Sequence, residues 1–187
     1  AVAYACEHQG TTLYFPKGIY ELKDKEAITL ETKVLNGEMG ENPEKIIYTP
    51  YYPYAKGLDF TGAKQVTVLA DQATLLCEGW MEPISLDQCE DVTVKGITID
   101  YKRKPFVSGD IVEITSDYFD VQFGEDKIVT EKMPLTRMTF WDKEKNRLYP
   151  EPIYFPKREL LGGNKVRFYH SLPQTLKGSN ATALNSF

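Results

Sequence analysis

Four acidic side chains lie in or beside one stretch of the sequence where acid–base chemistry could be built. Asp87, Glu90 and Asp91 are clustered, and Asp100 follows an alternating apolar run. Hydrolysis of a glycosidic bond needs two carboxyl groups across the scissile bond, so paired acids are the first candidates. At a turn, however, an aspartate more often accepts hydrogen bonds from the local backbone. The sequence favours this structural role and predicts no catalytic residue in the chain.

Other chemistries lack the residues that they need. His8 and His170 could each orient a nucleophile, but no Ser or Cys motif accompanies them. The sequence also has no Gly-rich phosphate loop, no HExxH metalloprotease motif and no EF-hand ligand series. Cys6, Cys77 and Cys89 have no metal-ligand spacing and, being odd in number, cannot all pair within one chain. We therefore expect no metal site and no cofactor, and we interpret the cysteines as buried free thiols.

Aromatic side chains are the second group that could bind a ligand. Tyr52 and Tyr54 alternate with prolines in a stiff segment, and Trp80 lies in a loop between two apolar runs. Such rings offer an apolar face and a polar tip, which suits stacking against sugars, but they can equally pack over the core. With Asp100 as a hydrogen-bonding partner, they form the predicted carbohydrate-binding set: Tyr52, Tyr54, Trp80 and Asp100.

Composition limits the classes of partner. The chain has 187 residues and a formal charge of −5, with acidic and basic residues mixed, so nothing indicates a nucleic-acid partner. The one basic run, 102–104, is interpreted as a solvated loop. No stretch approaches the roughly 20 apolar residues of a membrane-spanning helix. No signal peptide is visible, although the chain does not begin with Met.

The elements that would position these residues are revealed by a repeat. Segment 58–77 aligns with segment 84–101 at a shift of 26, which superposes the two VTV triplets that begin at Val66 and Val92. In each copy the alternation breaks at a corner, Lys95-Gly96 in the second, and then resumes. We expect Val66, Val68, Val92, Val94, Ile97 and Ile99 to face one interior. A parallel solenoid explains this pattern, and a β-meander is the alternative.

The first sixty residues fit the start of such a solenoid. Residues 1–6 have the composition of a helix end, and Pro16 to Gly18 separate two short strands in "TLYFPKGIYEL". Short strands are also predicted at 27–35 and 45–50. The helix would cover the end of the apolar stack, and we expect both chain ends to be cuts within a longer polypeptide.

These motifs resemble those of a known family. "FPKGIY" after a helix resembles the beginning of pectate-lyase-like right-handed parallel β-helices, and "DVTVKGITIDYKRKPFVSGDIVEI" (91–114) is similar to bacterial β-helix glycoside hydrolases of the α-1,3-galactosidase kind. The resemblance covers roughly residues 1–115. It implies a β-barrel inserted after the early coils and catalytic acids on later coils, beyond Phe187.

The sequence changes period after residue 108. Phe119, Val121 and Phe123 alternate with Asp120 and Gln122, and Val166 and Phe168 alternate with Arg167 and Tyr169. A polar turn at 142–146 separates two more strands. These are antiparallel hairpin signals. The predicted fold is thus all-β, with a capping helix and β-helix coils in 1–107 and a small antiparallel β-barrel or sandwich in 108–187.

Two functions follow from the resemblance. The first is the N-terminal piece of a secreted or periplasmic bacterial glycoside hydrolase, α-galactosidase-like, acting on polysaccharide or glycan chains and inactive alone. The alternative is a non-catalytic carbohydrate-binding β-helix module or a polysaccharide-lyase-like scaffold. The sugar, the linkage and the stereochemical outcome stay open. In either case an exposed strand edge is expected to favour self-association of the piece.

Overall fold

The computed structural model describes residues 1–125, 129–135, 137–149, 152–155 and 157–183. Most of the regular structure is strand. The chain divides into two compact units: unit 1 comprises Ala1–Glu31 and Pro53–Lys104, and unit 2 comprises Thr32–Tyr52 and Pro105–Phe187. The sequence predicts a boundary between residues 107 and 108. The structure divides the chain between 104 and 105, and it also assigns 32–52 to unit 2.

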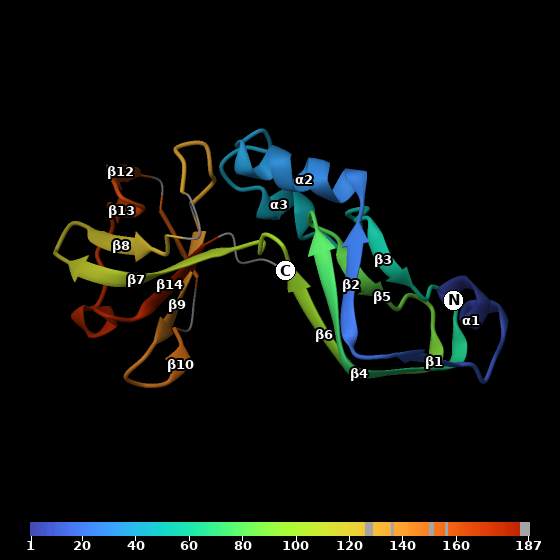
Figure 1. Cartoon of the computed structure of the whole chain (residues 1–187). Helices are drawn as coiled ribbons and strands as arrows, with labels where there is room; N and C mark the ends of the chain where they lie inside the picture. Colours follow the sequence, from blue (N-terminus) through green and yellow to red (C-terminus); the bar gives the residue numbers. More distant parts are fainter. Residues whose placement is uncertain (126–128, 136, 150–151, 156, 184–187) are drawn as a thin grey trace. The chain divides into compact units, whose positions relative to one another are not determined.

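Unit 1 is built from parallel strands and a short helix, α1 (Val2–Glu7), whose Ala5 belongs to the apolar cluster of the unit. The long strand β4 (Lys64–Glu78) pairs with β1 (Thr12–Phe15) and β2 (Gly18–Lys23), and also with β6 (Glu90–Tyr101) (Figure 1). A second parallel pair joins β3 (Lys56–Asp59) to β5 (Glu82–Ser85). All of these pairings are parallel, which excludes the β-meander for unit 1 because hairpin-connected strands run antiparallel.

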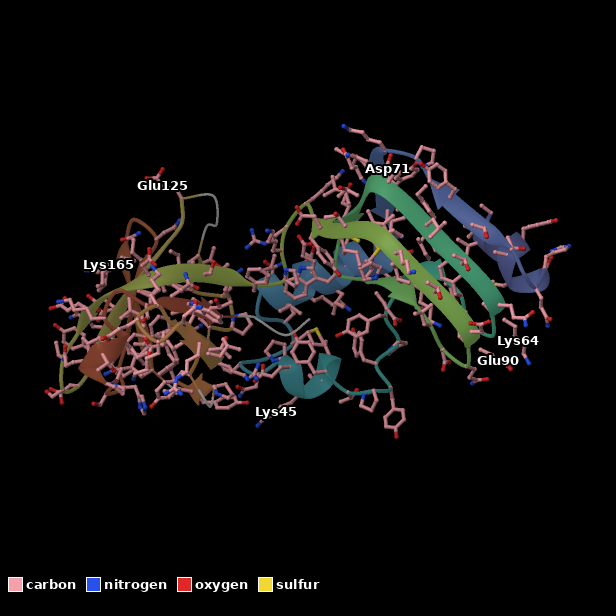
Figure 2. The ribbon with its side chains drawn as sticks, turned by 90° about the horizontal axis from the view of Figure 1, so that it is seen from below. Lys45, Lys64, Asp71, Glu90, Glu125 and Lys165 are labelled. Atoms are coloured by element: carbon pink, nitrogen blue, oxygen red, sulfur yellow. The ribbon has the colours of Figure 1, made fainter. Side chains whose placement is uncertain are left out.

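The register confirms the repeat that the sequence predicts. Leu58 pairs with Ile84 and Val66 with Val92, each at a separation of 26 residues. After the corner the pairing continues from Ala73 to Ile97, because the corner in β4 contains two more residues than the corner in β6. Lys64 and Glu90 lie side by side at the starts of β4 and β6, with Nζ and Oε2 3.1 Å apart (Figure 2).

Left-handed backbone recurs at the same places in successive repeats. Gln65 and Asp91, which occupy equivalent positions, have φ of 54° and 55°. The same holds for Gln72 and Gly96 at the second corner, with φ of 50° and 80°. Non-glycine residues rarely adopt this conformation. Its recurrence with Gln and Asp shows that the stack imposes the corner geometry on the backbone.

The apolar face of unit 1 points into one cluster. Val66, Val68 and Leu75 are fully buried, and Val92, Val94 and Ile97 pack partly buried against them. Ile99 pairs in register with the buried Leu75 and so shares its face, but it is itself 45% exposed. Its strand β6 pairs only with β4 among the described residues, so no further strand covers it there.

Two expected strands are replaced by helices. Segment 27–35 belongs to α2 (Lys25–Leu35), and segment 45–50 overlaps the end of α3 (Glu44–Ile47). Asp24 caps α2, since its Oδ1 accepts hydrogen bonds from the backbone N–H groups of Glu26 and Ala27. The buried positions Ala27, Leu30 and Val34 recur with the period of a helix, which outweighs the short apolar alternation that favoured a strand.

In the part of the chain that the structure describes, unit 2 contains an eight-stranded antiparallel sheet. Its strands pair in the order β10-β9-β14-β7-β8-β13-β12, with β11 beside β9. Their bounds are β7 (Val107–Ile114), β8 (Phe119–Phe123), β9 (Arg137–Asp142), β10 (Arg147–Leu148), β11 (Ile153–Tyr154), β12 (Arg158–Gly162), β13 (Lys165–Phe168) and β14 (Asn180–Ala183), with a 3-10 turn η1 (Gln174–Leu176).

The antiparallel prediction is confirmed, but the sheet does not close into a barrel. Among the described residues its outermost strands, β10 and β12, each have one partner. Phe119, Val121 and Phe123 face the core as expected, where Phe119 meets Phe155 with ring centroids 5.0 Å apart. Asp120, expected on the polar face, is completely buried.

An ion pair explains the burial of Asp120. Arg167 lies opposite it in register, and the guanidinium donates from Nε to Oδ1 at 2.8 Å and from Nη2 to Oδ2 at 3.0 Å. Lys165 adds a third contact at 3.2 Å, and the guanidinium lies over the Tyr118 ring. Burial alone would raise the pKa of Asp120, but these cationic partners hold it below its usual value.

None of the helices in the described part of the chain is long and apolar enough to cross a membrane.

Candidate functional site

The predicted carbohydrate-binding residues are divided between the two units. Tyr52 belongs to unit 2, whereas Tyr54, Trp80 and Asp100 belong to unit 1. Tyr52 and Tyr54 are half-buried. Trp80 is only 2% exposed, so its ring is buried, which agrees with the packing role that the sequence leaves open. It offers no ring face to a ligand in this conformation.

Two of the acidic residues that the sequence singles out, Glu90 and Asp100, interact with the local backbone or with neighbouring cations. Asp100 accepts a hydrogen bond at its Oδ1 from the Tyr101 N–H at 2.9 Å and lies 3.8 Å from Lys104 Nζ. Glu90 pairs with Lys64, while Asp87 and Asp91 are exposed. A general acid in a glycosidase instead sits in a pocket that raises its pKa. These carboxylates have the environment of turn and surface residues.

A charged column crosses three neighbouring strands of unit 1. Lys23 of β2 pairs in register with Glu78 of β4, and Lys102 directly follows the last residue of β6. Lys102 Nζ lies 2.8 Å from Glu78 and 3.3 Å from Glu21. Hydrogen bonds from Lys102 and Lys23 lower the pKa of Glu78. The first residue of the basic run is therefore paired with carboxylates of its own unit.

The three thiols are at least partly buried, whereas both imidazoles are exposed. Burial raises the pKa of Cys77 to about 11, and Cys89 contacts the carbonyl oxygen of Phe60 through Sγ at 3.0 Å. No disulfide links the three cysteines. His8 stacks on Tyr4 and His170 meets the edge of Phe155. In the part of the chain that the structure describes, no group of three His, Cys, Asp or Glu side chains could hold a metal ion.

A cavity of about 860 Å³ lies within unit 2. Its volume falls in the range of roughly 300–1,000 Å³ that is usual for small-molecule sites. Three parts of the chain form its wall: the turn before α3 with the start of that helix, residue Glu131, and residues 154–155 and 157–160 of β11, β12 and their flanks. The lining residues are Glu41, Asn42, Lys45, Glu131, Tyr154, Phe155, Lys157, Arg158, Glu159 and Leu160.

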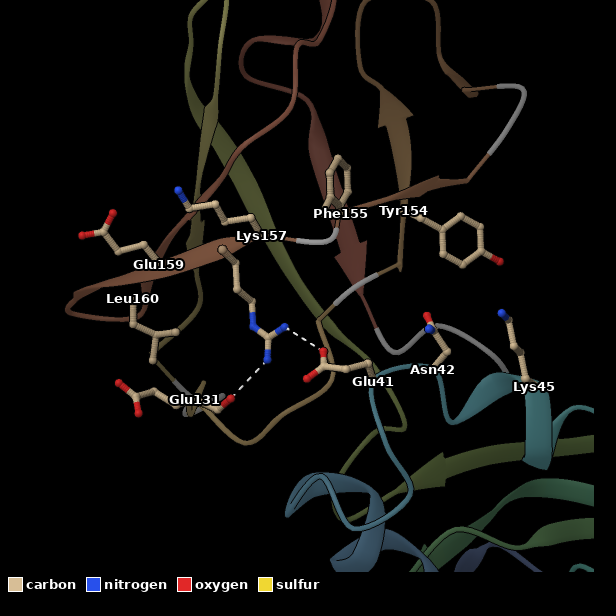
Figure 3. A pocket seen from close by; sticks show the side chains of 10 residues that line it. Glu41, Asn42, Lys45, Glu131, Tyr154, Phe155, Lys157, Glu159 and Leu160 are labelled. Atoms are coloured by element: carbon tan, nitrogen blue, oxygen red, sulfur yellow. Dashed lines mark hydrogen bonds and ion pairs between the residues drawn. The ribbon is translucent and has the colours of Figure 1, made fainter.

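Arg158 holds the three segments of this cavity together. Its Nη2 donates to the carbonyl oxygens of Glu131 at 3.1 Å and Met133 at 2.9 Å, and its Nη1 donates to Glu41 Oε2 at 3.3 Å (Figure 3). The Arg158 side chain is 14% exposed and that of Glu41 is 70% exposed. The guanidinium is thus fixed, while the carboxylate that it orients is open to solvent.

The two sides of the cavity differ in character. Tyr154, Asn42 and Lys45 lie on one side of Glu41, and Lys157, Glu159 and Leu160 lie on the other (Figure 3). Tyr154 is 50% exposed, whereas the next residue, Phe155, points into the core. On the far side, Glu159 accepts a hydrogen bond from the Tyr169 hydroxyl at 2.7 Å, and Lys157 lies over the Tyr169 ring.

Sequence reasoning missed this cavity. Its residues come from positions 41, 42, 45, 131, 154, 155 and 157–160, which no motif connects. The available signal was the alternation in "IYFPKRE", which combines one inward ring, Phe155, with an outward ring, Tyr154, next to a cluster of charges.

Comparison with known proteins relates the chain to carbohydrate-active enzymes at low identity. No family model matches the chain. It is 25% identical over 119 residues to alpha-1,3-galactosidase B and 28% identical over 120 residues to alpha-1,3-galactosidase A, both of Bacteroides thetaiotaomicron. Each match covers 63% of this chain but only 18% and 20% of the respective relative. The chain therefore spans about a fifth of the length of the curated relatives it matches, and it is related in sequence to glycoside hydrolases.

Proposed function

We propose that the chain is the N-terminal portion of a bacterial carbohydrate-active protein related to the α-1,3-galactosidases, and that unit 1 forms the first coils of a right-handed parallel β-helix. The similarity to two α-1,3-galactosidases is the observation that carries the proposal. The parallel register of β4 and β6 and the left-handed corners at Gln65 and Asp91 support the β-helix, since a solenoid repeats both from coil to coil.

The proposed substrate is a glycan or polysaccharide that carries α-linked galactose, and the catalytic carboxylates are proposed to lie outside residues 1–187. The environments of the acids in unit 1 support this part of the proposal, because Asp100 and Glu90 are engaged by local partners and Asp87 is exposed. Secretion or a periplasmic location, and sugar contacts by Tyr52, Tyr54 and Asp100, remain part of the proposal.

A second candidate is a non-catalytic carbohydrate-binding module. The cavity of unit 2 favours this candidate, because it places an exposed tyrosine near hydrogen-bonding side chains. Such an arrangement suits the binding of a ligand and requires no catalytic step. Both candidates predict that the 187-residue chain binds α-galactosides without cleaving them.

Two assays on the purified chain test the proposal. Hydrolysis of an aryl α-galactoside should stay at the rate of the uncatalysed reaction, whereas methyl α-D-galactopyranoside should bind more tightly than methyl α-D-glucopyranoside. Enzymatic hydrolysis that is lost in Asp87→Asn or Asp100→Asn would place the active site inside this chain. Equal binding of the two sugars would contradict the proposed preference for galactose.

A further inference from the structure

The cavity of unit 2 has the balance of charge that suits an uncharged ligand. Three cationic and three acidic side chains line it, so their formal charges cancel. Arg158 already pairs with Glu41, and Glu159 already accepts a hydrogen bond from the hydroxyl of Tyr169. An anionic ligand at Arg158 would have to compete with Glu41 and face three carboxylates, which costs free energy that a neutral ligand does not meet.

One polar group of the cavity, the guanidinium of Arg158, is held in place before any ligand arrives. Arg158 is held by two backbone carbonyls and by Glu41, so the Glu41 carboxylate is oriented and yet largely exposed. Such a carboxylate accepts hydrogen bonds, Lys45 donates them, and the amide of Asn42 belongs to a side chain that does both. Sugar hydroxyls donate and accept in the same way, and a fixed receptor loses little entropy when it binds them.

An aromatic face completes the arrangement. Tyr154 lies on the same side of Glu41 as Asn42 and Lys45 (Figure 3) and is 50% exposed, so its ring is accessible. Phe155, which directly follows β11, is buried and anchors this segment in the aromatic core. The C–H face of a pyranose packs against an accessible ring while its hydroxyls reach polar groups beside the ring.

We propose that this cavity binds a neutral saccharide, with Tyr154 as the stacking ring and Glu41, Asn42 and Lys45 as the hydrogen-bonding groups. The choice of a saccharide among neutral polar ligands rests on the proposed function. The choice of a neutral one rests on the charges of the cavity itself.

The test is a titration of the full 187-residue chain with each sugar, in which NMR signals of the sugar report its binding. The probes are methyl α-D-galactopyranoside, methyl α-D-glucopyranoside, methyl β-D-galactopyranoside and galacturonic acid. Tyr154→Ala should weaken binding of the preferred neutral sugar about tenfold, which is the loss expected for one stacking ring. Tyr154→Phe should retain most of the affinity, and Glu41→Gln should weaken it several-fold.

Matched controls separate the cavity from the rest of the surface. Tyr51 is 89% exposed, belongs to the same unit and does not line the cavity, so Tyr51→Ala should leave binding unchanged. The circular dichroism spectrum of each variant establishes that it is folded.

Each outcome decides one of the two proposals. Binding of methyl α-D-galactopyranoside that survives both Tyr154→Ala and Glu41→Gln overturns the cavity assignment and leaves the proposed function standing. Binding of a different neutral sugar that both variants weaken supports the cavity but overturns the preference for galactose. Tighter binding of galacturonic acid, or no binding of any neutral probe, overturns the inference.

Discussion

At Gly96 the corner of β6 lies against the preceding corner of the stack. Its φ is +80°, and a Cβ atom at this position would overlap the carbonyl oxygen of Ala70. Gly96→Ala should therefore destabilise unit 1 by at least about 2 kcal/mol, because a left-handed alanine costs about 1–2 kcal/mol before any overlap. Chemical denaturation followed by Trp80 fluorescence, in a Trp141→Phe background, measures this loss in unit 1.

Gly62 supplies the matched control for this substitution. It has a similar φ of +75°, but apart from its chain neighbours no described atom lies within 4 Å of the place that an alanine Cβ would take. Gly62→Ala should thus cost only the backbone term of about 1–2 kcal/mol, without the added overlap. Equal losses for the two variants would contradict the close approach of the two corners.

Asp120 is the other residue whose environment makes a sharp prediction. Asp120→Asn removes a buried charge that Arg167 and Lys165 contact, and leaves both cations with weaker partners. We expect unit 2 to lose roughly 1–3 kcal/mol, as for other buried groups that lose a partner. Asp110→Asn is the control, since Asp110 pairs with Lys143 on the surface and such pairs contribute about 0–1 kcal/mol. A loss at Asp120 no larger than at Asp110 would contradict this account.

Among the strands, the repeat is predictable from the sequence and the partners of buried charges are not. The superposition of Val66 on Val92 follows from the sequence because side chains on one strand face recur every second residue. Local alternation predicts that Asp120 is exposed on the polar face. Its burial could not be predicted, because its partner, Arg167, is 47 residues away and only the strand register brings the two together. The strand prediction for segment 27–35 is wrong because it gives the local alternation more weight than the Asp24 cap.

The column of Lys23, Glu78 and Lys102 makes a prediction about the parallel strands that carry it. Glu78→Gln removes the carboxylate that lies between Lys23 and Lys102. The variant should be less stable than the parent, and the difference should shrink as salt screens the charges. Denaturation midpoints at low and high ionic strength measure this. Glu113→Gln, in β7 of unit 2, is a control that should show no comparable salt dependence.

For the molecule as a whole, acid should weaken both units. The pKa values of Glu78 and Asp59 in unit 1 and of Asp120 and Asp142 in unit 2 lie below their usual range. A carboxyl whose pKa is lowered by folding stabilises the fold above its unfolded pKa, about 3.9–4.3, and this contribution is lost as pH falls through the folded value. Stability should therefore be nearly level from pH 7 to about 5 and fall below about 4.

Glu31 acts in the opposite sense and provides an internal control for the pH series. Burial raises its pKa, with Arg103 opposing and Glu78 adding to the shift. Its contribution to stability is present below its unfolded pKa and is lost as pH rises through the folded value. Glu31→Gln should consequently gain stability relative to the parent at pH 7 and lose that advantage at pH 4. A constant difference at both pH values would contradict this assignment.

Self-association is the second prediction for the whole molecule. Among the described residues β6 pairs only with β4, and Ile99 on β6 is 45% exposed. Unpaired backbone groups beside an apolar side chain favour pairing with a second copy of the chain. Light scattering over a dilution series should show a concentration-dependent mass that Ile99→Lys reduces. Val112→Lys is the control, because Val112 is 41% exposed on β7, which has a partner on both sides. A monomer at every concentration would contradict the prediction.

The candidate site is the part of the molecule least accessible to sequence reasoning. The sequence points to Tyr52, Tyr54 and Trp80 because aromatic residues in loops are visible in it, yet Trp80 is buried. It does not point to Tyr154 and Glu41, because their proximity depends on the fold of unit 2 and on the hydrogen bonds of Arg158. Local patterns reveal periodicity, whereas a cavity built from distant segments requires the register of the whole sheet.

The column of Lys23, Glu78 and Lys102 also affects which strand could pair with the outer edge of β6. β2 and β4 contribute Lys23 and Glu78, which are opposite in sign, and the series ends on the cation Lys102 directly after β6. A strand that joins this edge in parallel gains attraction if it brings a carboxylate to that place and meets repulsion if it brings Lys or Arg. A shift of the pairing register by one residue would turn this carboxylate to the other face of the sheet, and the attraction would be lost. Exposed charges that contribute little to stability can in this way select which sequence extends the sheet, and in which alignment.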